Sequence, residues 1–107
     1  MPASIVEKTM NGPWGSQYVV NGETLAVNLA CFSAGEGINV DEALSTMLAW
    51  PATTNPSIRE FWAEQMSVLT DRQRAEVVDR AKELRRIDDA AGYGSPESLF
   101  ERFDGQR

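Results

Sequence analysis

Three acidic side chains, Glu36, Asp41 and Glu42, lie close together in the sequence, and they are the first candidates for chemistry. Two carboxylates that converge in one pocket act as general acid and base when the pKa of one is raised. Asp41 and Glu42, however, follow Asn39 and are typical of the first turn of a helix, where the helix dipole favours negative charge. Nothing in the sequence indicates a converging carboxylate pair.

Other catalytic residue types are scarce. The chain contains no histidine, which excludes the commonest general base, His-paired nucleophiles and most zinc or copper sites. Cys31 is the single cysteine and lies in an apolar stretch, so we interpret it as a small buried hydrophobe. No glycine pattern matches a phosphate-binding loop. We therefore expect no enzyme activity, no metal site and no cofactor.

Charge indicates a protein partner. The formal net charge is −6, and residues 1–56 contribute −4 of it, from five acidic residues and one lysine. An acidic surface repels phosphate backbones and attracts basic proteins. We therefore expect a partner with a basic surface and no direct binding to nucleic acid.

Exposed aromatic residues are frequent anchors at protein interfaces. Trp14 stands beside Gly and Pro in an expected turn, and Tyr18 follows it on an expected strand. The predicted partner-binding residues are these two aromatics and the acids of the first half: Trp14, Tyr18, Glu23, Glu36, Asp41 and Glu42.

The segment 70–91 is the clearest structural element. Thr70 and Gln73 have the spacing of a capping box, and apolar residues recur three and four positions apart. Its other faces contain six acidic and six basic residues, so the predicted helix carries no net charge. A helix-turn-helix DNA-binding regulator, built from segments 56–69 and 71–91, would need an excess of basic residues on its recognition helix. Because the charges of 71–91 are balanced, DNA binding is the weakest alternative.

The first third of the chain predicts strands. Ile5–Met10 and Trp14–Val20 are strand candidates, separated by a turn at Asn11-Gly12. Asn21-Gly22 favours a type I′ hairpin that leads into a third strand through Thr24–Phe32. That third segment is apolar on both faces, so periodicity alone also allows a helix.

Helix signals follow. Asn39 with Glu42 predicts a cap for a helix that Pro51 ends. Asn55 as cap and Pro56 as first helical residue predict the next helix, and 95–104 a short last one. The expected fold is α+β: one domain, 1–107, in which a small N-terminal antiparallel meander of two or three strands packs against three helices and a short C-terminal helix.

These observations favour a small acidic, non-enzymatic protein-binding module. The most concrete hypothesis is an inhibitor of phage or mobile-element type, similar in action to an anti-CRISPR or anti-restriction protein, that sterically blocks a basic nucleic-acid-handling protein. The alternative is a phage structural or assembly chaperone, or a subunit that forms a homodimer through helices 56–91. No apolar run is long enough to span a bilayer and no secretory signal is recognisable, so we expect a cytoplasmic location.

Overall fold

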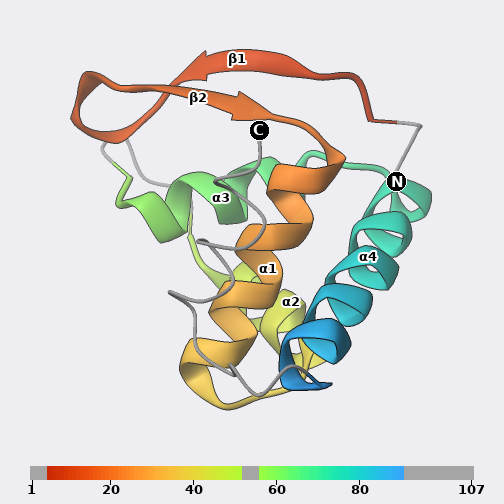
Figure 1. The fold of residues 1–107 in the computed structure, drawn as a ribbon. Coiled ribbons are helices and arrows are strands. Elements are labelled where there is room, and N and C mark those ends of the chain that lie inside the picture. The colour runs from red at the N-terminus through yellow and green to blue at the C-terminus, as the bar shows by residue number, and fades with distance from the viewer. Residues whose placement is uncertain (1–4, 52–55, 91–107) are drawn as a thin grey trace.

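The structure is a computed structural model that describes residues 5–51 and 56–90. Its elements, in chain order, are β1 (Lys8–Asn11), the 3₁₀ turn η1 (Pro13–Gly15), β2 (Gln17–Val20), α1 (Gly22–Glu36), α2 (Val40–Ala49), α3 (Ile58–Ser67) and α4 (Asp71–Ala90). The strands form one antiparallel hairpin beside four helices, which confirms the predicted α+β class (Figure 1). The predicted helix 95–104 lies outside the described residues.

The predicted hairpin at Asn21-Gly22 is wrong, and so is the third strand after it. The observed hairpin lies one turn earlier, with Lys8 opposite Val20 and Asn11 opposite Gln17. Asn21 instead caps α1: its side chain accepts a hydrogen bond from the Thr24 N–H, and the Thr24 hydroxyl accepts one from the Asn21 N–H. Asparagine tolerates both roles, and the reciprocal cap satisfies two backbone donors that a helix would otherwise leave unpaired.

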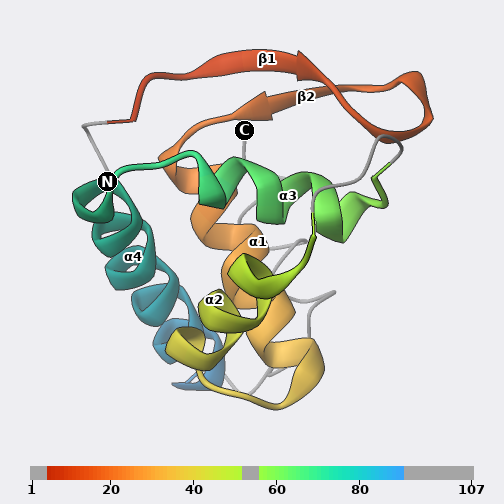
Figure 2. The same ribbon diagram turned by 180° about the vertical axis from the view of Figure 1, so that it is seen from behind.

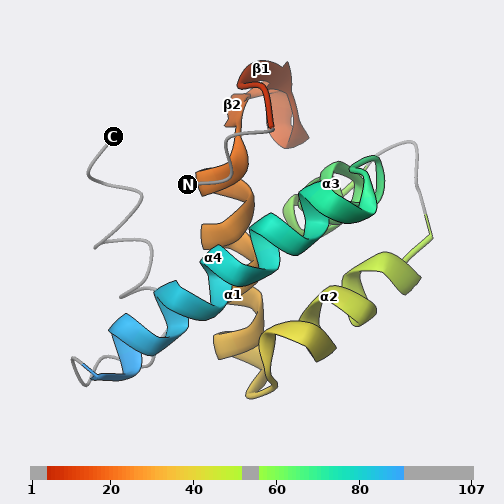
Figure 3. The same ribbon diagram turned by 90° about the vertical axis from the view of Figure 1, so that its right-hand side faces the viewer.

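Helix α1 is the centre of the fold, as Figures 1 and 3 show. Most of its residues from Thr24 to Ser33 are buried, and Leu29 and Ala30 are completely inaccessible. A helix that is apolar on all sides must be covered on all sides. Its alternating pattern, which predicted a strand, is therefore the pattern of a fully buried helix that ends at Gly37 in the left-handed conformation.

The other helices surround α1. Helix α4 crosses it on one side, while α2 packs on it from another and α3 lies beneath the hairpin (Figures 2 and 3). Helix α1 contributes seven residues to the core, more than any other element, and the rest come mainly from α2, α3 and α4, among them Met47, Phe61, Met66, Val77 and Leu84. The described part of the chain contains no helix that is both long and apolar enough to cross a membrane.

Helix caps are confirmed in two of three cases. Asn39 accepts from the Glu42 N–H at 2.8 Å, and Thr70 and Gln73 bond each other's backbone N–H. The third prediction is wrong, because α3 begins at Ile58 and its cap is Ser57. The Ser57 N–H donates to the Glu60 carboxylate, which lowers the pKa of Glu60 below its ordinary value. This reciprocal capping box favours a start after Ser57 over one at Pro56.

Candidate functional site

The tip of the hairpin carries the most exposed aromatic side chain of the described residues. Trp14 is 83% exposed, and its backbone lies in the left-handed region at φ 62° and ψ 21°. Gly15 follows with φ 71°. The turn is closed by two backbone hydrogen bonds, from the Gly12 N–H to the Ser16 carbonyl and from the Ser16 N–H to the Pro13 carbonyl. The tip therefore has a defined backbone that presents Trp14 to solvent.

The hairpin is fixed to the helices by an aromatic cluster. The ring of Tyr18 lies 5.0 Å from that of Phe61 and makes an edge contact with Trp62 at 6.2 Å, between ring centroids. Gly12 allows this approach, because a Cβ atom there would come within 2.5 Å of the Tyr18 ring. Val20, at the end of β2, is buried. Tyr18 thus supports the site from below, and only Trp14 of the two predicted aromatics faces outward.

The outer face of the hairpin is uncharged. Thr9 pairs with Val19 and Asn11 with Gln17, and paired residues two apart along a strand share one face. All four are exposed, and residues 9–22 contain no charged side chain. We call the five residues Thr9, Asn11, Trp14, Gln17 and Val19 the hairpin surface. Beside its tip lies a hollow of about 340 Å³, lined in part by Phe61 and Glu64 of α3.

The conformation of Trp14 gives a first prediction. A bulky residue in the left-handed region costs roughly 1–2 kcal/mol, whereas glycine adopts it freely. Because the exposed indole contributes little burial, we expect Trp14→Gly to raise the free energy of unfolding by about 0.5–1 kcal/mol, after the entropy cost of an added glycine. Urea unfolding measures the change. Trp14→Ala keeps the strain and should leave stability unchanged; equal stability of both variants would argue against a strained tip.

Three of the four predicted acidic residues lie at the end of α1 that is far from the hairpin, and only Glu23 lies in its first turn. Figure 1 shows the hairpin at the N-terminal end of α1 and the α1–α2 connection at its other end. Glu36, Asp41 and Glu42 flank this connection. A helix of 15 residues separates the two ends by about 22 Å. Trp14 and Tyr18 therefore lie on the hairpin, and Glu36, Asp41 and Glu42 form a separate group at the opposite end of α1.

Each of these acids has a partner within the chain. Both oxygens of Glu23 accept from Arg80 at 2.9 Å, Glu36 pairs with Arg59 at 3.2 Å, and Asp41 pairs with Lys82 at 2.9 Å. Glu42 accepts from the Asn39 amide in the cap of α2. Within the described residues, no three Cys, Asp or Glu side chains are grouped as metal ligands. Their placement fits ion pairs between helices and helix capping.

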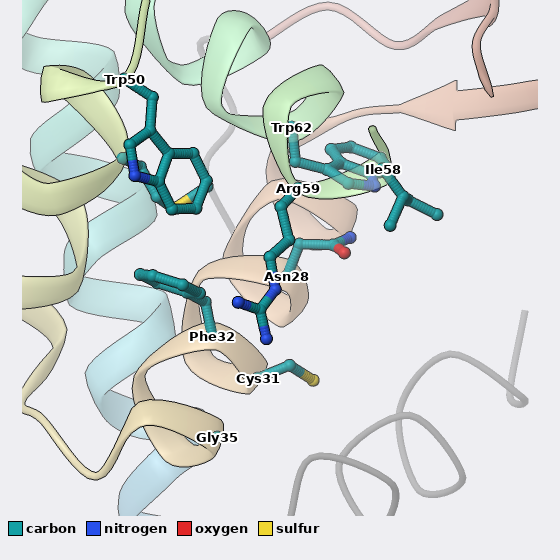
Figure 4. Close-up of a pocket in the computed structure, with 9 residues that line it drawn as sticks. Asn28, Cys31, Phe32, Gly35, Trp50, Ile58, Arg59 and Trp62 are labelled. Atoms are coloured by element: carbon teal, nitrogen blue, oxygen red, sulfur yellow. The ribbon is translucent and has the colours of Figure 1, made fainter. Parts of the chain in front are cut away.

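A second candidate site was not predicted from the sequence. A cavity of about 250 Å³ opens between α1, α2 and α3 and is lined mainly by apolar and aromatic side chains (Figure 4): Cys31, Phe32, Met47, Trp50, Ile58 and Trp62, with Asn28 and Arg59 as its polar side chains. We call it the aromatic pocket. The pocket was not predicted because a strand over residues 24–32 gives no reason to place Phe32 beside Trp50.

The sequence did contain one signal for the pocket: Asn28, Cys31, Phe32 and Gly35 have the spacing of residues on one face of a helix.

Contacts at the pocket mouth are weak and exchangeable. The Arg59 guanidinium lies 5.4 Å from the centre of the Phe32 ring, and its ion pair with Glu36 is about half exposed on both sides. Phe32 and Trp50 meet edge to face at 5.2 Å. Exposed pairs of this kind contribute roughly 0–1 kcal/mol, so the mouth can rearrange at low cost. Cys31 is buried, as expected from its apolar surroundings.

Comparison with known proteins adds no functional information. No protein-family model matches the chain, and searches of curated proteins and of solved structures find no match.

Proposed function

We propose that this chain is a non-enzymatic protein-binding module that contacts its partner through the hairpin surface. The observation that carries the proposal is the 83% exposed Trp14, held at the tip in a left-handed conformation. Tryptophan is the residue most enriched among those that dominate the energy of protein interfaces. A strained residue at an exposed tip persists only where the surrounding structure enforces it, and such residues concentrate at binding sites.

Rigidity supports this assignment. An aromatic cluster of Tyr18, Phe61 and Trp62 attaches the hairpin to α3. The turn that carries Trp14 is therefore already ordered before a partner binds. Anchors that are ordered before binding lose less conformational entropy in the complex. The neighbours Thr9, Gln17 and Val19 carry no charge, so burying them does not incur the large desolvation cost of an ionised group. The hairpin surface therefore combines the chemistry and the stiffness of an interface anchor.

The partner we propose is a protein with a basic surface. The net charge of −6 steers such a partner toward the chain over a distance of about one Debye length. Because Glu23, Glu36 and Asp41 already form ion pairs within the chain, we assign the acidic field to the encounter rate and the hairpin surface to affinity. An inhibitor of phage or mobile-element type, which blocks a basic nucleic-acid-handling protein sterically, is the class that matches this division.

Affinity capture from a bacterial lysate, read by mass spectrometry, tests the proposal. The bait is the full chain, compared with Trp14→Ala and with the control Val68→Ala, which truncates a 66% exposed apolar side chain directly after α3. We expect one basic protein to be enriched by the wild type and by Val68→Ala and to be reduced at least tenfold with Trp14→Ala. Equal capture by all three baits would contradict the role of the hairpin surface.

Salt separates the two contributions. Raising the ionic strength from about 0.05 to 0.5 M should slow association with the captured protein, because long-range attraction is screened. The dissociation rate should change little, because the indole contact is apolar. A dissociation rate that rises steeply with salt would contradict this assignment and would show that the acidic residues, rather than Trp14, hold the complex together.

A further inference from the structure

Strand β1 has a free edge. The Gly12 N–H donates to the Ser16 carbonyl, and hydrogen-bonded and non-hydrogen-bonded pairs alternate along an antiparallel ladder. The backbone groups of Thr9 and Asn11 therefore point away from β2. Within the described residues, no other element makes a backbone hydrogen bond to these groups. Each of the two residues thus offers one N–H donor and one carbonyl acceptor to a further strand.

The residues of this edge do not block pairing. Proteins usually protect a free edge with charged side chains, proline or a bulge. Residues 9–12 include no charged residue and no proline, and the pairing of β1 with β2 is continuous from Lys8 to Asn11. A sheet of two strands is marginal by itself, and a third strand stabilises it. The edge therefore suits strand addition, in which a partner contributes an extended segment.

The hollow of about 340 Å³ beside the hairpin tip lies along this edge, above α3 (Figure 2), and we call it the tip hollow. Met10 and Asn11 of β1 line it, whereas none of its described lining residues belongs to β2. Met10 pairs with Tyr18, whose ring contacts Phe61, so Met10 faces α3. Opposite residues of neighbouring strands point to the same face. In an added strand, the residue opposite Met10 therefore directs its side chain into the tip hollow.

The tip hollow combines aromatic rings with an acid. Trp14 and Phe61 supply the rings, and Glu64 supplies an exposed carboxylate. Among the described side chains, Glu64 forms no ion pair, unlike three of the four acids predicted from the sequence. Gln65 also lines the hollow and donates its Nε2 to the Phe61 carbonyl, which leaves Oε1 as an acceptor. A guanidinium stacks on aromatic faces and donates to such oxygens in a fixed fork, so this lining fits arginine.

We propose that the tip hollow receives an arginine side chain of the partner, carried on an extended segment that pairs with the free edge of β1. Thr9 and Asn11 hold the backbone of the segment, Trp14 and Phe61 contact the guanidinium and its aliphatic stem, and Glu64 neutralises the charge. Charge complementarity supports this occupant, because a chain of net charge −6 keeps an acid without an ion pair beside its exposed indole. The inference rests on the proposed function, since it names the group of the basic partner that meets Trp14.

One such ion pair is compatible with the weak salt dependence expected for dissociation. Salt screens partly buried pairs much less than exposed ones, and the bound arginine covers Glu64 from one side. The backbone hydrogen bonds to β1 involve no net charge. The dissociation rate of the complex should therefore still change little with ionic strength.

Titration of the full chain with a short peptide, followed by amide NMR signals, tests the inference. The probe is acetyl-Thr-Val-Arg-Val-Thr-amide, which has strand-forming residues around one arginine, and the matched control peptide has alanine in place of the arginine. We expect the wild type to bind the probe with a dissociation constant of about 1 mM and the control at least fivefold more weakly. The amide signals of Thr9 and Asn11 should shift, and those of Gln17 and Val19, on the opposite edge, should not.

Two variants test the acid of the tip hollow. Glu64→Gln keeps the shape of the side chain and removes its charge, so it should weaken binding of the probe about three- to tenfold. The control Asp79→Asn removes a charge at an exposed position on α4, outside the tip hollow, and should bind like the wild type. Absence of binding to the wild type at about 5 mM peptide overturns the inference, as does equal binding of the two peptides.

Other occupants give different results. If N-acetyl-arginine amide bound as tightly as the probe, the edge of β1 would have no role. If the Thr9 and Asn11 signals shifted on raising the protein concentration without peptide, a second copy would occupy the edge. Either result overturns the inference. The capture experiment stays separate: Trp14→Ala would still lose the captured protein if only the arginine contact were wrong, and the probe would still bind if only the proposed function were wrong.

Discussion

Leu29→Ala is expected to lower the free energy of unfolding by about 2–5 kcal/mol. Leu29 is completely buried in α1, the helix on which α2, α3 and α4 pack. Removing its side chain loses the transfer free energy of the deleted atoms and leaves a cavity that three surrounding helices cannot fill without moving. Urea unfolding followed by far-UV circular dichroism measures the loss, at a temperature where the wild type is fully folded.

Leu48→Ala is the matched control for this experiment. Leu48 is 39% exposed on α2, so the same truncation there removes less buried surface and leaves no enclosed cavity. We expect a loss of about 1 kcal/mol or less. If both variants lost the same amount, α1 would not be the centre of the core. A wild-type midpoint retained by Leu29→Ala would be the stronger contradiction.

Local signals were sufficient to predict α2 and α4. Each begins at a cap whose two members are three residues apart, and α4 has one apolar stripe between charged faces. Both signals are encoded within one or two helical turns, so the distant chain does not alter them. Helix α3 was predicted for the same reason, and its start was misplaced because Pro56 and Ser57 both offer a helix start.

Helix α1 could not be predicted, because its environment decides its structure. A segment that is apolar at alternating and at helical spacings is compatible with a buried strand and with a buried helix. Asn21-Gly22 suits a tight hairpin turn and also a helix cap followed by the first helical residue. The choice depends on α2, α3 and α4, which pack around α1, and on Arg80, which reaches Glu23 from 57 residues away.

The candidate site was predicted in part. Its position between Pro13 and Gly15 in an expected turn made Trp14 a candidate binding residue, and the structure places it exposed at the tip. Its positive φ could not be read from residue type, because tryptophan rarely adopts that conformation. The aromatic pocket was missed because Phe32 and Trp62 lie on α1 and α3 while Trp50 follows α2, and α1 was wrongly predicted to be a strand.

Arg80→Ala is expected to cost about 2–3 kcal/mol of unfolding free energy. Its guanidinium holds both oxygens of Glu23 in a fork at 2.9 Å, and it also bonds Glu83. The side chains of Arg80 and Glu23 are only 24% and 18% exposed, so removing one leaves the other partly buried without its main partner. The hydrogen bond to Glu23 also raises the pKa of Arg80 above its ordinary value.

Lys82→Ala is the control on the same helix. Its ion pair with Asp41 also joins α4 to another helix, but the two side chains are 49% and 66% exposed. We expect a loss of about 0.5 kcal/mol or less, because water screens the pair. A double-mutant cycle of Arg80→Ala with Glu23→Gln isolates the interaction itself, and a coupling below about 0.5 kcal/mol would contradict its structural role.

The same pair separates folding from binding at Glu23. This residue was predicted to contact a basic partner, yet its carboxylate is directed to Arg80 in the described structure. We therefore expect Glu23→Gln to lower the midpoint of urea unfolding while the protein that remains folded captures its partner at nearly the wild-type level. Trp14→Ala should do the reverse, with an unchanged midpoint and lost capture. If Glu23→Gln instead abolished capture at full stability, the N-terminal end of α1, where Glu23 lies, would belong to the interface, and the hairpin surface would be only one part of it.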